Sequence, residues 1–230
     1  MRTKTLLIAA AAMAAGVASS MAQVTYSQNI VGYATVVLPG NGQYTLVANP
    51  FDDGNGNFAT NILNAALPKQ SQYLTWGGAS YTTVQKLAAG WPGTASAQLA
   101  PGQGFFVRNG GVASGAPDIT NVFVGSVITP VGTSVTNSLA LGFTLQGSPI
   151  PYGGNLAISG QAGGDTNMDF GSPLTKQSQI LTWNGVAQAF STVQKVGSAW
   201  GGTASVGVGE GFFINNKNGP ATNVVETLNP

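Results

Sequence analysis

The stretch that decides the fold is Lys69-Gln70-Ser71-Gln72-Tyr73-Leu74-Thr75-Trp76, because it returns 107 residues later as Lys176-Gln177-Ser178-Gln179-Ile180-Leu181-Thr182-Trp183, with Tyr73 alone replaced. Two more stretches return in the same order: Thr83-Val84-Gln85-Lys86 as Thr192-Val193-Gln194-Lys195, and Gly102-Gln103-Gly104-Phe105-Phe106 as Gly209-Glu210-Gly211-Phe212-Phe213. This period is too long for a short solenoid repeat. It indicates an internal duplication and predicts two similar modules in tandem.

The repeated stretches are typical of β-strands. They are short, rich in Val, Thr, Phe, Tyr and Trp, and separated by Gly, Asn and Pro. We therefore predict an all-β protein of two tandem β modules, each a sandwich or an open barrel. Gly77-Gly78 and Asn184-Gly185 are typical of two-residue hairpin turns. One short helix is expected near residues 60–67, where Thr60 would cap the start and Pro68 would enforce the end.

Strand alternation predicts which side chains of the repeated stretch are buried. It places Leu74 and Trp76 on one face of the first copy, and Leu181 and Trp183 on one face of the second. Because each tryptophan shares a face with a leucine, we expect both tryptophans to be core residues.

The first 22 residues have the pattern of an export signal. Arg2 and Lys4 precede an apolar run too short to span a bilayer, and Ser20-Met21-Ala22 supplies the small residues that favour cleavage before Gln23. The expected organisation is a signal peptide at 1–22, a first β module at 23–126 and a second at 127–230. We expect an exported protein, extracellular or at the cell surface, with the periplasm as the alternative.

Charge limits the classes of partner. Without the signal, six basic and seven acidic residues remain, which gives a net charge of −1. Such a chain has no basic patch to neutralise phosphates, so nucleic acid is not an expected partner. No later stretch is long and apolar enough to be an integral membrane span. A net charge near zero favours association, so a homo-oligomer is one expected assembly.

Three short segments resemble one another at the ends and middle of the chain. They begin at Asn29, Asn121 and Asn223, and we expect them to be strands that open and close the modules. A middle strand at 121–127 that closes the first module and opens the second would make the two a single cooperative unit. In each pair, Phe105-Phe106 and Phe212-Phe213, one ring would face its own core and the partner module would cover the other.

A resemblance rests on Val47-Ala48-Asn49-Pro50-Phe51, the strand ending in Trp76, and Ala100-Pro101-Gly102-Gln103-Gly104-Phe105-Phe106-Val107. These motifs resemble a β module of secreted bacterial surface proteins. The opening residues 27–33 are similar to the start of small exported proteins of verrucomicrobial type. The second copy departs from the pattern, with Gly147-Ser148-Pro149 where the first has Ala48-Asn49-Pro50. The resemblance implies export and a non-enzymatic β architecture, with no catalytic residues to carry over.

Two acidic loops are candidates for a metal site. Asp53, Asn55 and Asn57 alternate in the first copy, and Asp165, Asn167 and Asp169 alternate in the second. Alternate oxygen side chains are how calcium loops wrap their cation, although neither loop has the glycine and the final glutamate of an EF-hand. Calcium is therefore the one cofactor considered, and the alternative is that these side chains cap turns.

Aromatic side chains near glycines are candidates for a sugar-binding surface. Rings with neighbouring amides can stack on sugars and hold their hydroxyl groups. Trp91 and Trp200 stand in Gly-rich stretches, and Tyr73 and Tyr81 flank the repeated strand. A surface polysaccharide is the partner that this set would bind, and the alternative is that the rings are core residues.

The sequence favours a binding protein over an enzyme. Histidine, the commonest acid–base residue, is absent, and so is cysteine. We expect a secreted, non-catalytic structural or interaction protein of the bacterial surface that self-associates. The alternatives are a carbohydrate-binding module and, third, a glycoside hydrolase, which would need two facing carboxylates.

Overall fold

The protein is almost entirely β-structure, in several antiparallel sheets. The computed structural model describes residues 30–92, 98–110, 116–129 and 134–227, so the predicted signal peptide lies outside the described residues. The first half contains β1 (Val31–Leu38), β2 (Tyr44–Ala48), α2 (Ala59–Ile62), β3 (Gln72–Trp76), β4 (Tyr81–Gln85), β5 (Gly104–Arg108) and β6 (Ile119–Ser126). Its main sheet has the order β2-β5-β3-β4, and β1 pairs with β6 as a separate two-stranded ribbon, the first ribbon.

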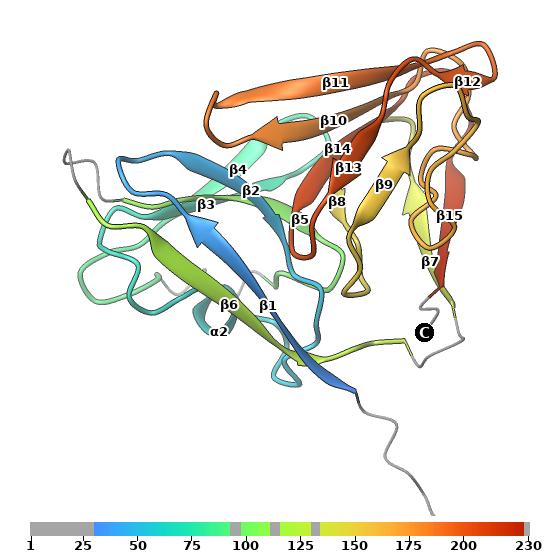
Figure 1. The fold of residues 1–230 in the computed structure, drawn as a ribbon. Helices are drawn as coiled ribbons and strands as arrows, with labels where there is room; N and C mark the ends of the chain where they lie inside the picture. The colour runs from blue at the N-terminus through green and yellow to red at the C-terminus, as the bar shows by residue number, and fades with distance from the viewer. Residues whose placement is uncertain (1–29, 93–97, 111–115, 130–133, 228–230) are drawn as a thin grey trace, which may run out of the picture.

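The second half uses the same order of strands. It contains β7 (Ser134–Leu139), β8 (Gly142–Gly147), β9 (Gly154–Ala157), β10 (Gln179–Asn184), β11 (Ala189–Val196), β12 (Ala199–Trp200), β13 (Ala204–Val206), β14 (Gly211–Asn216) and β15 (Thr222–Thr227). Its main sheet is β8-β14-β10-β11-β12, β9 pairs with β13, and β7 pairs with β15 as the second ribbon. Figure 1 shows the two halves side by side, with the hairpin of β10 and β11 reaching over the first sheet.

The repeated sequence motifs build the same loop in both halves. Gln70 and Gln177 have φ values of 71° and 68°, in the left-handed region that glycine usually occupies. Each glutamine N–H donates to the carbonyl of the repeated lysine, Lys86 or Lys195, at 2.8 Å. The Lys86 ammonium in turn donates to the carbonyls of Ala65 and Leu67, both at 2.7 Å. These hydrogen bonds therefore connect the start of β3 to the end of β4, and the start of β10 to the end of β11.

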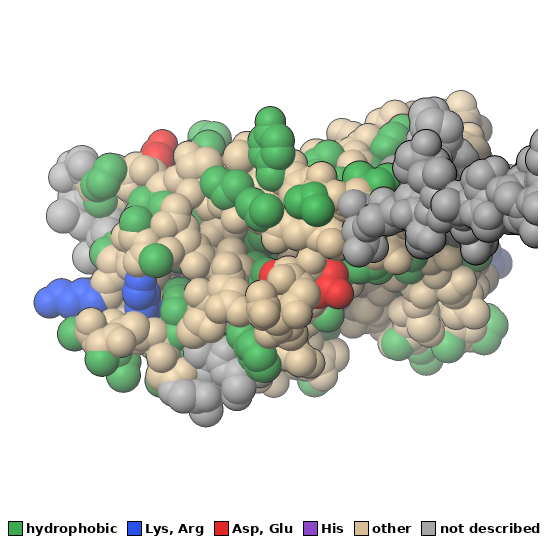
Figure 2. Space-filling view, turned by 90° about the horizontal axis from the view of Figure 1, so that it is seen from below, with side chains coloured by type: hydrophobic (Ala, Val, Ile, Leu, Met, Phe, Trp, Pro, Cys, Tyr) green, Lys and Arg blue, Asp and Glu red, His purple; other side chains and the backbone are tan. Residues whose placement is uncertain are grey.

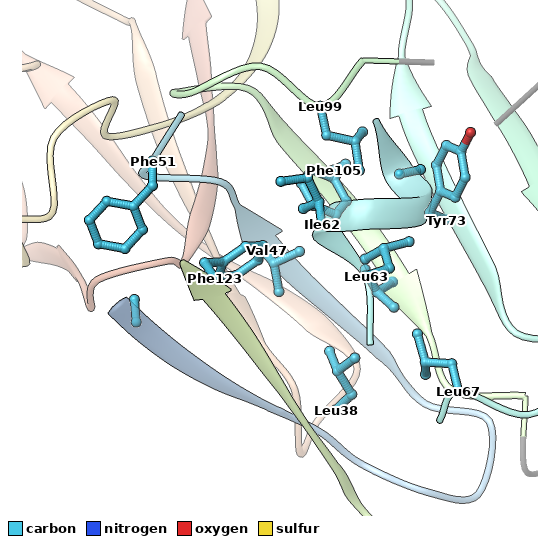
Figure 3. Packing of buried hydrophobic residues seen from close by; sticks show 13 residues of the cluster. Leu38, Val47, Phe51, Ile62, Leu63, Leu67, Tyr73, Leu99, Phe105 and Phe123 are labelled. Carbon is cyan, nitrogen blue, oxygen red and sulfur yellow. The ribbon is translucent and has the colours of Figure 1, made fainter. Parts of the chain in front are cut away.

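Each half has its own hydrophobic core. In the first, the side chains of β1, β2, β5, β6 and the short helix meet around Phe105 and Phe123 (Figure 3). In the second, Phe212 packs against Phe170 with ring centroids 4.9 Å apart, and Trp200 and Ile214 join the same cluster. Burial of this kind is the main stabilising contribution in a chain without cysteine.

A third cluster joins the halves. Phe105 and Phe212 lie in their own cores, whereas Phe106 and Phe213 lie together with Leu46 and Leu145 between the two main sheets. The prediction that each second phenylalanine is covered by the other half is therefore confirmed. We call this group, with the rings packed against it, the inter-half cluster.

Close backbone approach across the junction explains two repeated glycines. A Cβ at Gly104 would lie 2.7 Å from the Gln146 carbonyl oxygen, and one at Gly211 would lie 2.8 Å from that of Val47. Both glycines are the first residues of strands, β5 and β14. The junction is also bonded directly, because Ala48 N donates to Gly209 O at 2.8 Å and Gly147 N to Gly102 O at 2.9 Å.

The structure corrects three local predictions. The hairpin loops have four residues, since Trp76 pairs with Tyr81 and Asn184 with Ala189. The helix covers only Ala59–Ile62, and its N-cap residue is Phe58, which gives no side-chain cap. At its C-terminal end the buried Asn121 amide donates to the Ile62 carbonyl, and the Asn121 amide oxygen accepts from Asn64 N. The middle strand, β6, pairs with β1 and, through Ser126, with Asp52 of the same half, and the second half opens instead with β7.

Candidate functional site

The four aromatic residues predicted to bind sugar lie in three different places. Tyr73 is fully buried in the first core, where its ring lies 5.3 Å from that of the half-buried Trp91. Trp200 is 2% exposed in the second core, and its indole N–H donates to Ala162 O at 3.1 Å. Only Tyr81, 39% exposed, has substantial access to solvent. These rings therefore form no common row, and the faces of Tyr73 and Trp200 are covered by protein.

The first candidate calcium loop is closed by its own hydrogen bonds. Asp53 Oδ1 accepts from the N–H groups of Asn55 at 2.8 Å and Asn57 at 2.7 Å, and Oδ2 accepts from the Asn61 amide. Burial acts to raise the pKa of Asp53, but these hydrogen bonds together outweigh it and hold the pKa below its ordinary value. The carboxylate thus has the turn-capping role that was the alternative.

The second candidate loop uses its acids in a similar way. Asp165 Oδ2 accepts from Asn155 N at 2.7 Å, and Asp169 Oδ1 accepts from the N–H groups of Gly164 and Ser172. Asn167 lies between them in sequence and makes an interaction of its own. Within the described ranges, no three acidic side chains gather as a metal-binding group. Calcium binding stays a prediction from the sequence.

Trp76 and Trp183 were expected in the core, and this expectation was wrong. Both are half-buried and pack against the inter-half cluster. Trp76 lies 5.5 Å from Phe213 of the other half, and Trp183 lies 5.1 Å from Phe106. The indole N–H groups also cross the junction, from Trp76 to Phe143 O at 3.0 Å and from Trp183 to Tyr44 O at 2.9 Å. Strand alternation correctly placed each tryptophan on the same face as its leucine, but that face packs against the other half.

One side of the junction is hollowed into a groove of about 600 Å³, which we call the inter-half groove. Its walls come from β1 and β2 of the first half and from β10, β11, β13 and residues 208–211 of the second. The Gln188 side chain fixes the overlying hairpin, because it accepts from Tyr44 N at 2.9 Å and donates to Tyr44 O at 3.0 Å. No sequence pattern indicated this groove, since its lining residues are far apart in the chain.

The outer face of the first ribbon is apolar and open to solvent. Tyr33 is 77% exposed and Val31 is 69% exposed, and Val122 and Val124 of β6 stand beside them on the same face. Neither strand contains a charged residue. Figure 2 views the molecule from below, the side on which β1 and β6 lie in Figure 1, and hydrophobic side chains are visible among the polar surface. Such a patch is typical of an interaction site.

A buried carboxyl lies in the second half. Glu226 is fully buried, and Asn137 Nδ2 donates to its Oε1. Burial raises the pKa of Glu226 to about 8, although hydrogen bonds with Ser148 and Asn137 act to lower it. The Ser148 hydroxyl lies 2.6 Å from Glu226 Oε2 and 2.7 Å from Ile150 O, but it has one hydrogen. A protonated Glu226 resolves this, because the carboxyl then donates to Ser148 and the hydroxyl donates to Ile150.

Comparison with protein-family models, curated proteins and solved structures finds no match for this chain. Among the described residues, none of the helices has the length and apolar character needed to cross a membrane.

Proposed function

We propose that this protein is a non-catalytic interaction protein of the bacterial surface, exported by its N-terminal signal, that associates with a second copy of itself through the outer face of the first ribbon. The observation that carries the proposal is the exposed apolar face of Val31, Tyr33, Val122 and Val124. Exposed apolar surface that is contiguous favours a partner, because its removal from water is stabilising.

Charge favours a second copy as the partner. In a two-fold contact the same patch meets itself, so any charge near the axis would meet a like charge. Both strands of the first ribbon are without charge, and the chain without its signal carries only −1, so two copies meet little repulsion. The two apolar faces would pack as the sheets of a sandwich do.

The residues of the inter-half groove support a non-catalytic role. Its lining includes one carboxylate, Glu210, whereas glycoside hydrolysis uses a facing pair. The second acid that a hydrolase would need is not among the lining residues.

The test is the molar mass of residues 23–230 in solution, measured by size-exclusion chromatography with light scattering. We expect an oligomer for the unchanged chain and a monomer for Val122→Lys, because the substitution places two like charges in the contact. Val225→Lys is the matched control, since Val225 faces Thr136 as Val122 faces Thr35, and the two valines are 53% and 45% exposed. A monomeric unchanged chain, or equal effects of the two lysines, would refute the proposal.

A further inference from the structure

The inter-half groove has the size of a ligand site. Small-molecule sites occupy on the order of 300–1,000 Å³ and are found preferentially between domains, and this groove of about 600 Å³ lies between the two halves. Its position at the junction means that both halves contribute to one surface, which neither half would form alone.

The lining of the groove is rich in hydroxyl groups. Five of them come from Thr35, Thr45, Thr182, Ser191 and Ser205. A hydroxyl both donates and accepts, so such a lining can pair with a ligand whose own groups are hydroxyls. The Thr45 hydroxyl oxygen is buried and has no hydrogen-bond partner among the described residues. Trp183 also lines the groove.

Glu210 sets the charge of the groove. It is the only charged residue in the lining, so an anionic ligand would be repelled. Gly207 N–H holds Oε2 at 2.8 Å, and Gly209 in the same turn has a φ of 80°, so the carboxylate is fixed on a tight turn. Its other oxygen, Oε1, has no protein partner in the described part of the chain and can accept from two neighbouring hydroxyls of one sugar.

From the hydroxyl lining and the single carboxylate, we infer that the inter-half groove binds a neutral oligosaccharide chain. The residue that matches Glu210 in the first half is Gln103, which precedes β5 as Glu210 precedes β14 and forms the same type of backbone bridge, to Gln146 where Glu210 bridges Val47. The inference does not depend on self-association, because Glu210 is outside the first ribbon and none of Val31, Tyr33, Val122 and Val124 lines the groove.

The test is calorimetric titration of residues 23–230 with three neutral probes, cellohexaose, mannohexaose and chitohexaose, and with polygalacturonate as the anionic probe. We expect at least one neutral probe to bind and polygalacturonate not to bind. Glu210→Gln should weaken the neutral probe about ten-fold or more, because a charge-assisted hydrogen bond is lost. Gln103→Glu is the matched control and should leave the affinity unchanged.

Three outcomes would overturn the inference: no neutral probe binds at millimolar concentration, polygalacturonate binds more tightly than the neutral probes, or the two substitutions have equal effects. A fourth contrary outcome would be binding of an extended peptide library in place of all three sugars. Repeating the titration with Val124→Lys separates this result from self-association. Val124 lies on the same outer face but pairs with Tyr33, which does not line the groove, so a monomer should bind the sugar equally well.

Discussion

The two ribbons have the same pairing and register but opposite surfaces. Tyr33 faces Val124 in the first ribbon, and the pair at the same place in the second is Ser134 and Thr227. The first ribbon presents tyrosine and valine to solvent, whereas the second presents mostly serine, threonine and asparagine. Because the pairing is set by the inner faces, the outer faces are free to differ. The difference locates the proposed interaction surface in one half alone.

The inner faces also differ, and at one matching position the second ribbon carries an acid. Phe123 pairs with Ala34 in the first ribbon, and Glu226 pairs with Val135 at the same place in the second. Both side chains are buried, so a phenyl ring and a carboxyl occupy matching sites. The second site supplies Ser148 and Asn137 as partners for the carboxyl, and the first is lined by hydrophobic side chains. The carboxyl is therefore buried at the site that supplies hydrogen-bond partners for it.

The largest expected effect comes from placing the acid of the second ribbon at the matching position of the first. Phe123→Glu should lower the free energy of unfolding by more than the roughly 3–5 kcal/mol typical of Phe→Ala, because it also buries a carboxyl without partners. Urea unfolding measures the loss, and Phe123→Leu, which keeps an apolar side chain, should lose less. Equal stability of the Glu and Leu variants would show that the two sites are not different.

A smaller effect is expected in the pH dependence of stability, through the buried Glu226 of the second half. The pKa of Glu226 is about 8 when folded and near 4.5 when unfolded, so the folded state keeps a proton that the unfolded state releases. Stability should be full below pH 4.5, fall by at most about 1.4 kcal/mol per pH unit as pH rises, and level off above about 8. Glu226→Gln should flatten this fall in thermal unfolding across the range. A Gln variant whose profile runs parallel to that of the unchanged chain would contradict the assignment.

The smallest expected effect tests whether the two tryptophan hydrogen bonds across the junction contribute equally to stability. Trp76→Phe and Trp183→Phe each remove one indole N–H bond across the junction, and each should cost about 0.5–1.5 kcal/mol in chemical denaturation. Unfolding should stay a single transition, because the inter-half cluster joins both cores. A loss from only one substitution, or two separated transitions, would show that the junction is not shared evenly.

The sequence was most informative where neighbouring residues decide the structure. Period-two alternation and turn residues are local signals, so they predicted the all-β class, the returning strands and the opposite directions of each phenylalanine pair. The loop acids followed the same logic, because Asp53 bonds to N–H groups two and four residues away. The hairpin loops were misjudged, since two favourable turn residues do not fix where strand pairing stops.

Only the tertiary structure decided what each face meets. The sequence placed Trp76 and Trp183 beside leucines, but burial in a core and burial against another half produce the same alternation. Trp200 was taken for a loop residue because of its glycines, yet it pairs in β12 and is buried. The inter-half groove and the Glu226 site join residues from distant segments, such as Ser148 and Glu226. Local sequence patterns do not predict such pairs, because their proximity follows from how the sheets pack and not from neighbouring residues.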